Sequence, residues 1–435
     1  MKHLWKLTAL SLALLLCLSA CGKSASTEQA PSADTEGPGA EAVQEPTEAA
    51  VAAAAIDPNA IEAIYLGVLN YGGEGVDKEH RDTFLYRFLI DGEERALSVD
   101  NGQGTYPVQN QLKEDHRFAL TMEGDTVTAV QELDSAVSTY LPPVSGVPGT
   151  RTVANFLKTA LEPVGTTLYI YGGGWDWQDE GSSVQATTLG VSPDWVQFFD
   201  RHDESYTFKE VNGDTDKADP ANSYFPYGGY NEYYYAGLDC SGYLGWTVYN
   251  TAETQSGKSG YVRASTGFAR SLSELGWGTW TQDVDQKALR PGDVMSINGH
   301  VWISLGSCPD GSTVILHCTP SRSRAGQPGG GVQISAIGPD ESCQAYALAE
   351  QYISKYFPAW YQRYPVYLCS PESYFAFEGE QAGLFTWNTD SESSAFTDPE
   401  GIQSMDAAQV LETLFAGAAV PTAQESAEGT DTAAP

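Results

Sequence analysis

Short apolar stretches alternate with polar positions along residues 58–137 of the chain. Alternation with a period of two is typical of strands that bury one face, and the Asp91-Gly92 pair between two of these stretches is typical of a tight hairpin. The pattern predicts a small all-β domain over residues 58–137, an SH3-like or similar barrel. Such a module either binds a polymer or serves only for packing.

A boundary rich in proline and glycine follows, and we predict a linker over residues 138–148. The next apolar positions recur at helical spacing after Thr152, a residue type that favours helix N-termini. We therefore predict a helix over residues 152–161 as the first element of a second domain, which covers residues 149–340. The apolar positions of this helix are Val153, Phe156, Leu157, Ala160 and Leu161.

A second helix is predicted to begin at Cys240, with Asp239 as its N-cap. In the first turn of a helix, unpaired N–H groups and the helix dipole stabilise a thiolate and lower the thiol pKa. The same N–H groups are able to bind an oxyanion. We expect Gly242 to leave this turn open to a substrate backbone. The alternative is that Cys240 is a small buried hydrophobic residue.

Residues 299–306 form a predicted strand with His300 and Trp302 on one face and aliphatic residues on the other. After a turn over residues 307–312, the chain returns through His317. In an antiparallel pair the numbers of opposed residues have a constant sum, and an odd sum places both histidines on one face.

A bulge at Gly311 would reverse that parity. With the parity kept, we predict that His317 orients the ring of His300 by a hydrogen bond, as the third group of a nucleophile triad does. The alternative is that His317 is a polar residue at the end of the hairpin.

The N-terminus combines Lys2 and Lys6 with an apolar run that closes on Leu-Ser-Ala-Cys21. This predicts a lipoprotein signal peptide over residues 1–20 and lipidation of Cys21, which would hold the protein at the outer face of the cytoplasmic membrane. The inner leaflet of an outer membrane is the alternative location. The apolar run is too short to span a bilayer. An ordinary secretory peptide with an incidental cysteine is the alternative.

Two segments have a composition that does not support a packed core: residues 21–57 and residues 418–435. We predict a disordered tether and a disordered tail. The formal net charge is −34, which disfavours nucleic acid and anionic lipid surfaces as partners. No group of residues has the spacing of a metal or cofactor site, and we predict neither.

Five cysteines remain after Cys17 and Cys21 are set aside: Cys240, Cys308, Cys318, Cys343 and Cys369. Because five is odd, at least one of them forms no disulfide within the chain. If the four other than Cys240 pair, three connectivities are possible, and the sequence does not select one.

Several motifs together resemble the NlpC-type cell-wall peptidases, which are papain-like cysteine enzymes. The motifs are Tyr-x-Tyr-Gly-Gly from Tyr169, Asp-Cys-Ser-Gly from Asp239, Arg-Pro-Gly-Asp-Val from Arg290, His-Val-x-Ile-x-Leu-Gly from His300 and Val-Ile-Leu-His ending at His317. The resemblance implies an α+β protein with a papain-like domain. It also implies hydrolysis of peptidoglycan stem peptides, typically after γ-linked D-Glu, through a thioester on the cysteine.

The resemblance also implies roles for individual residues. Cys240 corresponds to the nucleophile, His300 to the base and His317 to the orienting residue. The residues implied to contact substrate are Tyr169, Asp239, Ser241 and Arg263, and Trp302 replaces a small residue and is expected to narrow the site. For Arg263, an ordinary surface charge is the alternative.

Two segments depart from the family pattern: an insertion over residues 174–238 and an extension over residues 341–417. The insertion is expected to rebuild the lip of the cleft. Two other functions stay open. One is a lipoprotein that binds wall peptides without cutting them, and the other is an amidase or acyltransferase on the same fold. In each case we expect a monomer.

Overall fold

The computed structural model describes residues 57–68, 85–100, 108–133, 140–175, 181–201, 233–252, 260–376, 379–390 and 394–421. The predicted signal peptide, the lipidation site Cys21 and almost all of the tether lie outside the described residues. Across the described ranges, no helix has both the length and the apolar character that crossing a bilayer requires.

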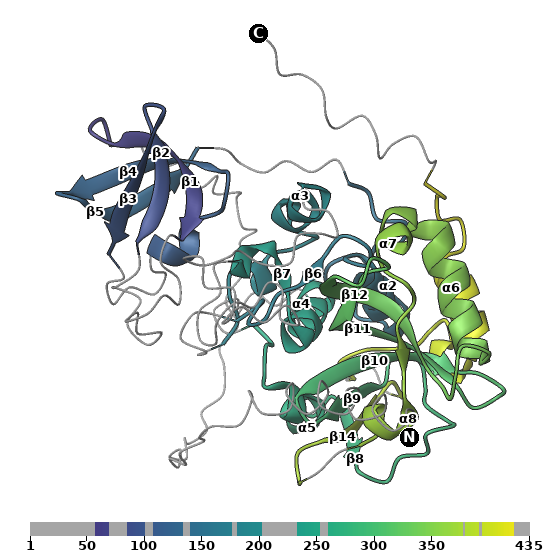
Figure 1. Ribbon diagram of the computed structural model, residues 1–435. Coiled ribbons are helices and arrows are strands. Elements are labelled where there is room, and N and C mark those ends of the chain that lie inside the picture. Colours follow the sequence, from purple (N-terminus) through teal and green to yellow (C-terminus); the bar gives the residue numbers. More distant parts are fainter. Residues whose placement is uncertain are drawn as a thin grey trace, which may run out of the picture.

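The N-terminal part is a closed five-stranded barrel, drawn in purple and blue in Figure 1. Around the barrel the strands follow the order β1-β2-β3-β5-β4, and only the β3–β5 pair is parallel. Asp91 and Gly92 have φ angles of 51° and 79°, the positive values that a tight hairpin turn between β2 and β3 requires. The strands are β1 (Ile61–Val68), β2 (Tyr86–Ile90), β3 (Glu93–Val99), β4 (Arg117–Glu123) and β5 (Thr126–Glu132), and a short 3-10 turn, η2, covers Val108–Gln111.

The larger part is built on a nine-stranded sheet in the order β7-β6-β12-β11-β10-β9-β14-β8, with β13 paired to β12. Three long strands form its centre: β10 (His300–Ser307), β11 (Thr313–Arg322) and β12 (Pro328–Ile337). The others are β6 (Leu168–Tyr169), β7 (Gly237–Leu238), β8 (Gly278–Thr281), β9 (Val294–Ile297), β13 (Leu368–Cys369) and β14 (Gly383–Trp387).

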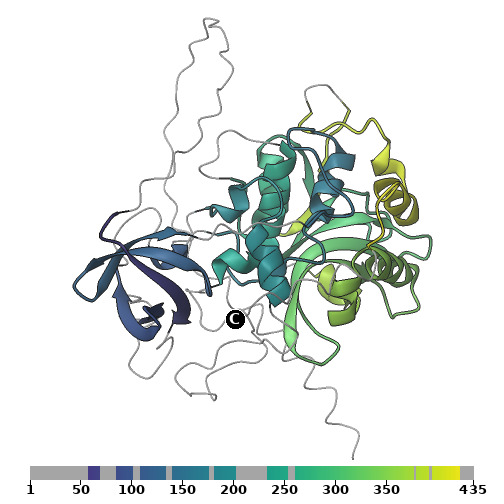
Figure 2. The ribbon, with the colours of Figure 1, turned by 90° about the horizontal axis from the view of Figure 1, so that it is seen from above.

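Helices pack against this sheet (Figures 1 and 2). The predicted first helix is confirmed as α2, and the side chain of Thr152 caps it by accepting a hydrogen bond from the Asn155 N–H at 3.1 Å. The α-helices are α2 (Val153–Leu161), α3 (Pro193–Arg201), α4 (Cys240–Ala252), α5 (Phe268–Glu274), α6 (Gln344–Tyr356), α7 (Pro358–Arg363), α8 (Pro371–Tyr374) and α9 (Ala407–Leu414). Short 3-10 turns are η3 (Gln185–Thr187), η4 (Tyr234–Ala236), η5 (Ser265–Gly267) and η6 (Ile402–Ser404).

The two faces of the central strands belong to different cores, as the alternation over residues 299–306 predicts. Val301 and Ile303 join the main core with residues of α2, α4, α6 and α9. Trp302 joins a smaller core on the other face with Ile315 and Phe375. The face that carries the even-numbered residues of β10 is therefore covered by the segment around α8.

The extension over residues 341–417 is an integral part of the larger fold. Its strand β14 lies between β9 and β8 in the sheet, and its strand β13 pairs with β12. Its helices α6 and α9 contribute Ala349 and Val410 to the main core. The segment that the sequence left without a place thus completes the sheet and covers both of its faces.

Candidate active site

Cys240 is the first residue of α4, as predicted. The carboxylate of Asp239 accepts hydrogen bonds from the Gly242 N–H at 2.7 Å and from the Ser241 hydroxyl at 2.9 Å. The Tyr243 N–H donates to the Asp239 carbonyl at 2.9 Å, which is the first bond of the helix. Asp239 is therefore the N-cap. Burial raises its pKa to about 6, although these hydrogen bonds act in the opposite direction.

The first turn of α4 packs against the backbone of a glycine-rich loop. A Cβ atom on Gly242 would lie 2.0 Å from the carbonyl oxygen of Gly173. The same loop accepts a hydrogen bond from the Asp239 N–H at 2.9 Å. The indole of Trp175 donates to the Ser241 hydroxyl at 3.1 Å. The expectation that Gly242 leaves room for a substrate is therefore wrong, because the protein itself fills that space.

The thiol of Cys240 lies beside the start of strand β10. Its Sγ atom is 3.9 Å from the carbonyl oxygen of Gly299, the residue before His300, and its side chain is 6% exposed. The Gly299 N–H donates to the Thr266 hydroxyl of η5 at 3.0 Å, which fixes this end of the strand. Tyr169 of β6 pairs with Leu238 of β7, two residues before the cysteine. Burial raises the pKa of Tyr169 well above its ordinary value, and Cys240 adds to this effect.

The two histidines lie on one face of the sheet. In the β10–β11 pair Ile303 lies opposite Leu316. The numbers of opposed residues therefore sum to 619 in the part of the pair that contains His300 and His317. The sum is odd, as the prediction requires, but the histidines are offset by two residues along the strands. The irregularity lies between Ser304 and Gly306, beyond the histidines.

A chain of hydrogen bonds runs inward from His300. Its Nε2 atom lies 3.1 Å from Nδ1 of His317, and Nε2 of His317 lies 2.9 Å from the hydroxyl of Ser335 on β12. Burial lowers the pKa of His300 to about 4. Burial, and then the charge of His300, lower the pKa of His317 well below its ordinary value. Both rings are therefore neutral at pH 7, and each has one nitrogen that accepts a hydrogen bond.

Tyr374 of α8 completes this arrangement, and the sequence analysis did not find it. Its hydroxyl lies 3.3 Å from Nδ1 of His317. Its ring packs edge-on against that of His300, with 5.6 Å between centroids. The residue belongs to the extension, 57 positions after His317, and no motif around it marks it as part of a site.

Two residues that were expected to contact substrate have other environments. Trp302 is 1% exposed and packs edge-on against Phe375, which leaves no side-chain surface for a substrate. Its burial argues against the predicted narrowing of a cleft. Arg263 is exposed, and its guanidinium donates to the Val262 carbonyl at 2.8 Å. It precedes η5, the turn that holds Gly299.

The other cysteines do not form disulfides: within the described residues, all five cysteines lack one. Cys318 lies close to the site on the main-core face, with its thiol 3.0 Å from the Leu238 carbonyl. Cys369 belongs to the smaller core on the other face. Pairing of Cys318 with Cys369 is therefore excluded, because the sheet separates them.

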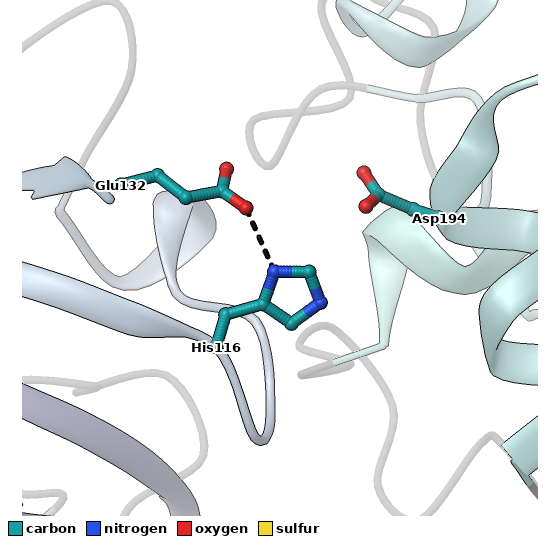
Figure 3. A group of neighbouring side chains, drawn as sticks. All are labelled: His116, Glu132 and Asp194. Carbon is teal, nitrogen blue, oxygen red and sulfur yellow. Dashed lines mark hydrogen bonds and ion pairs between the residues drawn. The ribbon is translucent and has the colours of Figure 1, made fainter. Parts of the chain in front are cut away.

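A second cluster lies where the barrel meets α3, and Figure 3 shows three of its side chains. His116, Glu132 and Asp194 place ligand atoms within 4.8 Å of one another. The ammonium of Lys113 already bridges the two carboxylates, at 2.9 Å from Glu132 and 2.7 Å from Asp194. The cluster is therefore an ion-pair network between the two parts of the protein, with a lysine at the position that a metal ion would take.

Comparison with known proteins adds no relative. A scan against protein-family models, a search of curated proteins and a search of solved structures each give no match.

Proposed function

We propose that this protein is a lipid-anchored cysteine endopeptidase that hydrolyses peptidoglycan stem peptides, with the bond after γ-linked D-Glu as the expected target. The observation that carries the proposal is a cysteine at a helix N-terminus whose thiol lies 3.9 Å from the carbonyl oxygen of Gly299, the residue before a histidine that a second histidine contacts at 3.1 Å. In this proposal the larger domain is papain-like, Cys240 is the nucleophile, His300 is the base and His317 is the orienting residue.

The proposed reaction begins with transfer of the Cys240 proton to Nδ1 of His300, the ring nitrogen that does not face His317. The thiolate adds to the amide carbonyl, and the resulting oxyanion lies at the positive end of the α4 dipole. The Gly242 N–H does not take part, because it donates to the Asp239 carboxylate. His300 returns the proton to the amine as the C–N bond breaks and the thioester forms. Water, deprotonated by His300, then hydrolyses the thioester and restores the thiol. No cofactor takes part in these steps.

The remaining roles are part of the same proposal. Asp239 and Ser241 flank Cys240 in the chain, and Tyr169 pairs with Leu238 two residues before it. In the proposal these three residues contact the peptide, and Arg263 contacts it from the exposed segment before η5. Lipid on Cys21 would hold a monomer at the outer face of the cytoplasmic membrane, with the tether reaching toward the wall. The burial of Cys240 favours a second candidate, a lipoprotein that binds wall peptides without cutting them.

Digestion of purified peptidoglycan tests the proposal directly. The full chain in mild detergent is compared with Cys240→Ala, and Cys308→Ala serves as a control because Cys308 is equally buried but lies at the far end of β10. Mass spectrometry of the soluble fragments should show new peptide ends with the wild type and Cys308→Ala and none with Cys240→Ala. Binding by all three proteins without new ends would leave the wall-binding candidate. Release of whole stem peptides from glycan would indicate an amidase.

A further inference from the structure

Nδ1 of His317 has two polar neighbours. Nε2 of His300 lies 3.1 Å away and the hydroxyl of Tyr374 lies 3.3 Å away. A neutral imidazole has a hydrogen on one nitrogen and a lone pair on the other. If Nδ1 of His317 has the lone pair, His300 donates to it from Nε2, and Nδ1 of His300 is left as an acceptor. If Nδ1 of His317 has the hydrogen, it donates to Nε2 of His300, and the hydrogen of His300 then lies on Nδ1.

Only one of these two states suits a base that must accept a proton at Nδ1. Ser335 does not select between them, because a hydroxyl both donates and accepts. The serine therefore stabilises either tautomer of His317. The group that selects the tautomer of His317 therefore has to contact its Nδ1 atom, and Tyr374 does so.

Tyr374 is held firmly in this position. Its side chain is 7% exposed, and its ring contacts both imidazoles, with centroid distances of 5.6 Å to His300 and 5.7 Å to His317. Its helix α8 is capped by Ser370, whose hydroxyl accepts from the Ser373 N–H at 3.3 Å. Strand β13, which ends one residue before this cap, pairs with β12 and anchors the segment to the sheet.

The hydroxyl of Tyr374 has three polar neighbours: Nδ1 of His317 at 3.3 Å, the Thr319 hydroxyl and the Cys369 thiol. Burial raises the pKa of Tyr374 well above its ordinary value, the hydrogen bond with Cys369 also raises it, and the hydrogen bond with Thr319 lowers it. A neutral thiol is a weak acceptor, and the imidazole nitrogen is the stronger one.

We infer that Tyr374 is a positioning residue: its hydroxyl donates to Nδ1 of His317, keeps the lone pair there, and so holds the hydrogen of His300 on Nε2. Nδ1 of His300 is then open to the proton of Cys240. This role rests on the proposed function, because it prepares His300 for that transfer. It assigns to the C-terminal extension an indirect part in the chemistry of the site, through His317.

Two measurements test the inference without a substrate. Long-range 1H–15N correlation spectra of the full chain, labelled with [15N]histidine, report which ring nitrogen carries the hydrogen. Alkylation of Cys240 by iodoacetamide across pH reports how readily His300 accepts the proton. Tyr374→Phe keeps the ring and removes the hydroxyl. The control is Tyr361→Phe, which removes a hydroxyl that donates to Glu350 at 2.8 Å, away from the imidazoles.

We expect the wild type and Tyr361→Phe to carry the hydrogen on Nε2 in both His300 and His317. Tyr374→Phe should show a mixture of tautomers, and alkylation at pH 7 should slow about three- to ten-fold, the factor that one hydrogen bond contributes. A positioning role predicts that the tautomers and the pH profile of alkylation change in Tyr374→Phe and not in Tyr361→Phe. A loss of packing would instead lower the unfolding temperature and leave the tautomers unchanged.

Two results would overturn the inference. One is a wild-type spectrum with the hydrogen on Nδ1 of His317, which needs no variant and therefore does not depend on the folding of Tyr374→Phe. The other is a folded Tyr374→Phe protein with unchanged tautomers and an unchanged alkylation profile. If these readouts respond to Tyr374→Phe while the wild type releases no peptidoglycan fragments, the positioning role stands and the proposed substrate is wrong.

Discussion

At the scale of single residues, burial controls which groups carry charge in the larger domain. Burial raises the pKa of Glu162 and of Asp293 to about 7 in each case, and that of Asp239 to about 6. The same cause lowers the pKa of His300 to about 4. Burial shifts the pKa of acids upward and that of bases downward, since the charged form loses its solvation in the interior. The neutral base at His300 is one instance of this effect.

Glu162 gives a test of this effect outside the site. Its carboxyl accepts a hydrogen bond from the Gly146 N–H, and its folded pKa of about 7 lies above the ordinary value of 4.5. Between these values the folded state binds more protons than the unfolded state, so stability falls as the pH rises. Glu162→Gln keeps the acceptor but does not titrate. We expect it to gain about 3 kcal/mol over the wild type between pH 4.5 and pH 8, measured by urea unfolding.

The exposed substitution Glu412→Gln on α9 is the control for that experiment. It should follow the wild-type dependence on pH. If the free energy of unfolding depends on pH in the same way in the wild type and in Glu162→Gln, the pKa of Glu162 is not raised.

At the scale of elements, the first turn of α4 is fixed by what it packs against. The loop through Gly173 approaches so closely that Gly242 has no room for a Cβ atom. The N-cap Asp239 donates its N–H to the carbonyl oxygen of the same glycine, Gly173. The position of the Cys240 thiol thus depends on a contact between two backbone segments and not on the helix alone.

Gly242→Ala should therefore destabilise the protein. Its Cβ would lie 2.0 Å from a backbone oxygen that cannot rotate away, and we expect a loss of about 2 kcal/mol despite the better helix propensity of alanine. Gly267→Ala is the matched control, since its nearest neighbour is the flexible end of Gln381 at 3.1 Å. Denaturant unfolding of both variants gives the comparison. Equal, small losses would show that the loop moves aside.

At the scale of the whole molecule, the barrel and the larger domain meet through polar groups. Lys113 of the barrel part lies between Glu132 of the barrel and Asp194 of α3, and the Glu114 N–H donates to the Tyr235 hydroxyl at 3.0 Å. Burial by itself would raise the pKa of Glu132, but its bonds with His116 and Lys113 outweigh this, and the pKa lies below its ordinary value. A lysine that bridges two carboxylates therefore joins the domains.

Lys113→Met keeps the length of the side chain and removes the charge. The two carboxylates would then face each other without a cation, and we expect the contact between the domains to weaken by about 1–3 kcal/mol. Hydrogen exchange at the Glu114 amide is the local measurement, because that N–H bonds across the contact. It should accelerate in Lys113→Met and stay slow in the exposed variant Lys287→Met. Unchanged exchange would show that other contacts hold the domains together.

The sequence by itself determined the local features of the site. Asp239 and Cys240 were placed at a helix start because capping depends on neighbours within one turn. Strand alternation placed the two histidines on one face only for an odd hairpin register, and the observed pairing meets that condition. Asp91-Gly92 specified its turn because few residue pairs accept two positive φ angles. Each of these follows from interactions over a few residues.

Only the tertiary structure decided what surrounds these features. Tyr374 reaches His317 from 57 residues away, and β14 enters the sheet between two earlier strands. Trp302 is buried by Phe375, and Gly242 is held against Gly173. Contacts of this kind join segments that carry no common pattern, because packing selects them by shape and position after the elements have formed. Local periodicity therefore located the thiol and the imidazoles, and the packing of distant segments determined which hydroxyl reaches them.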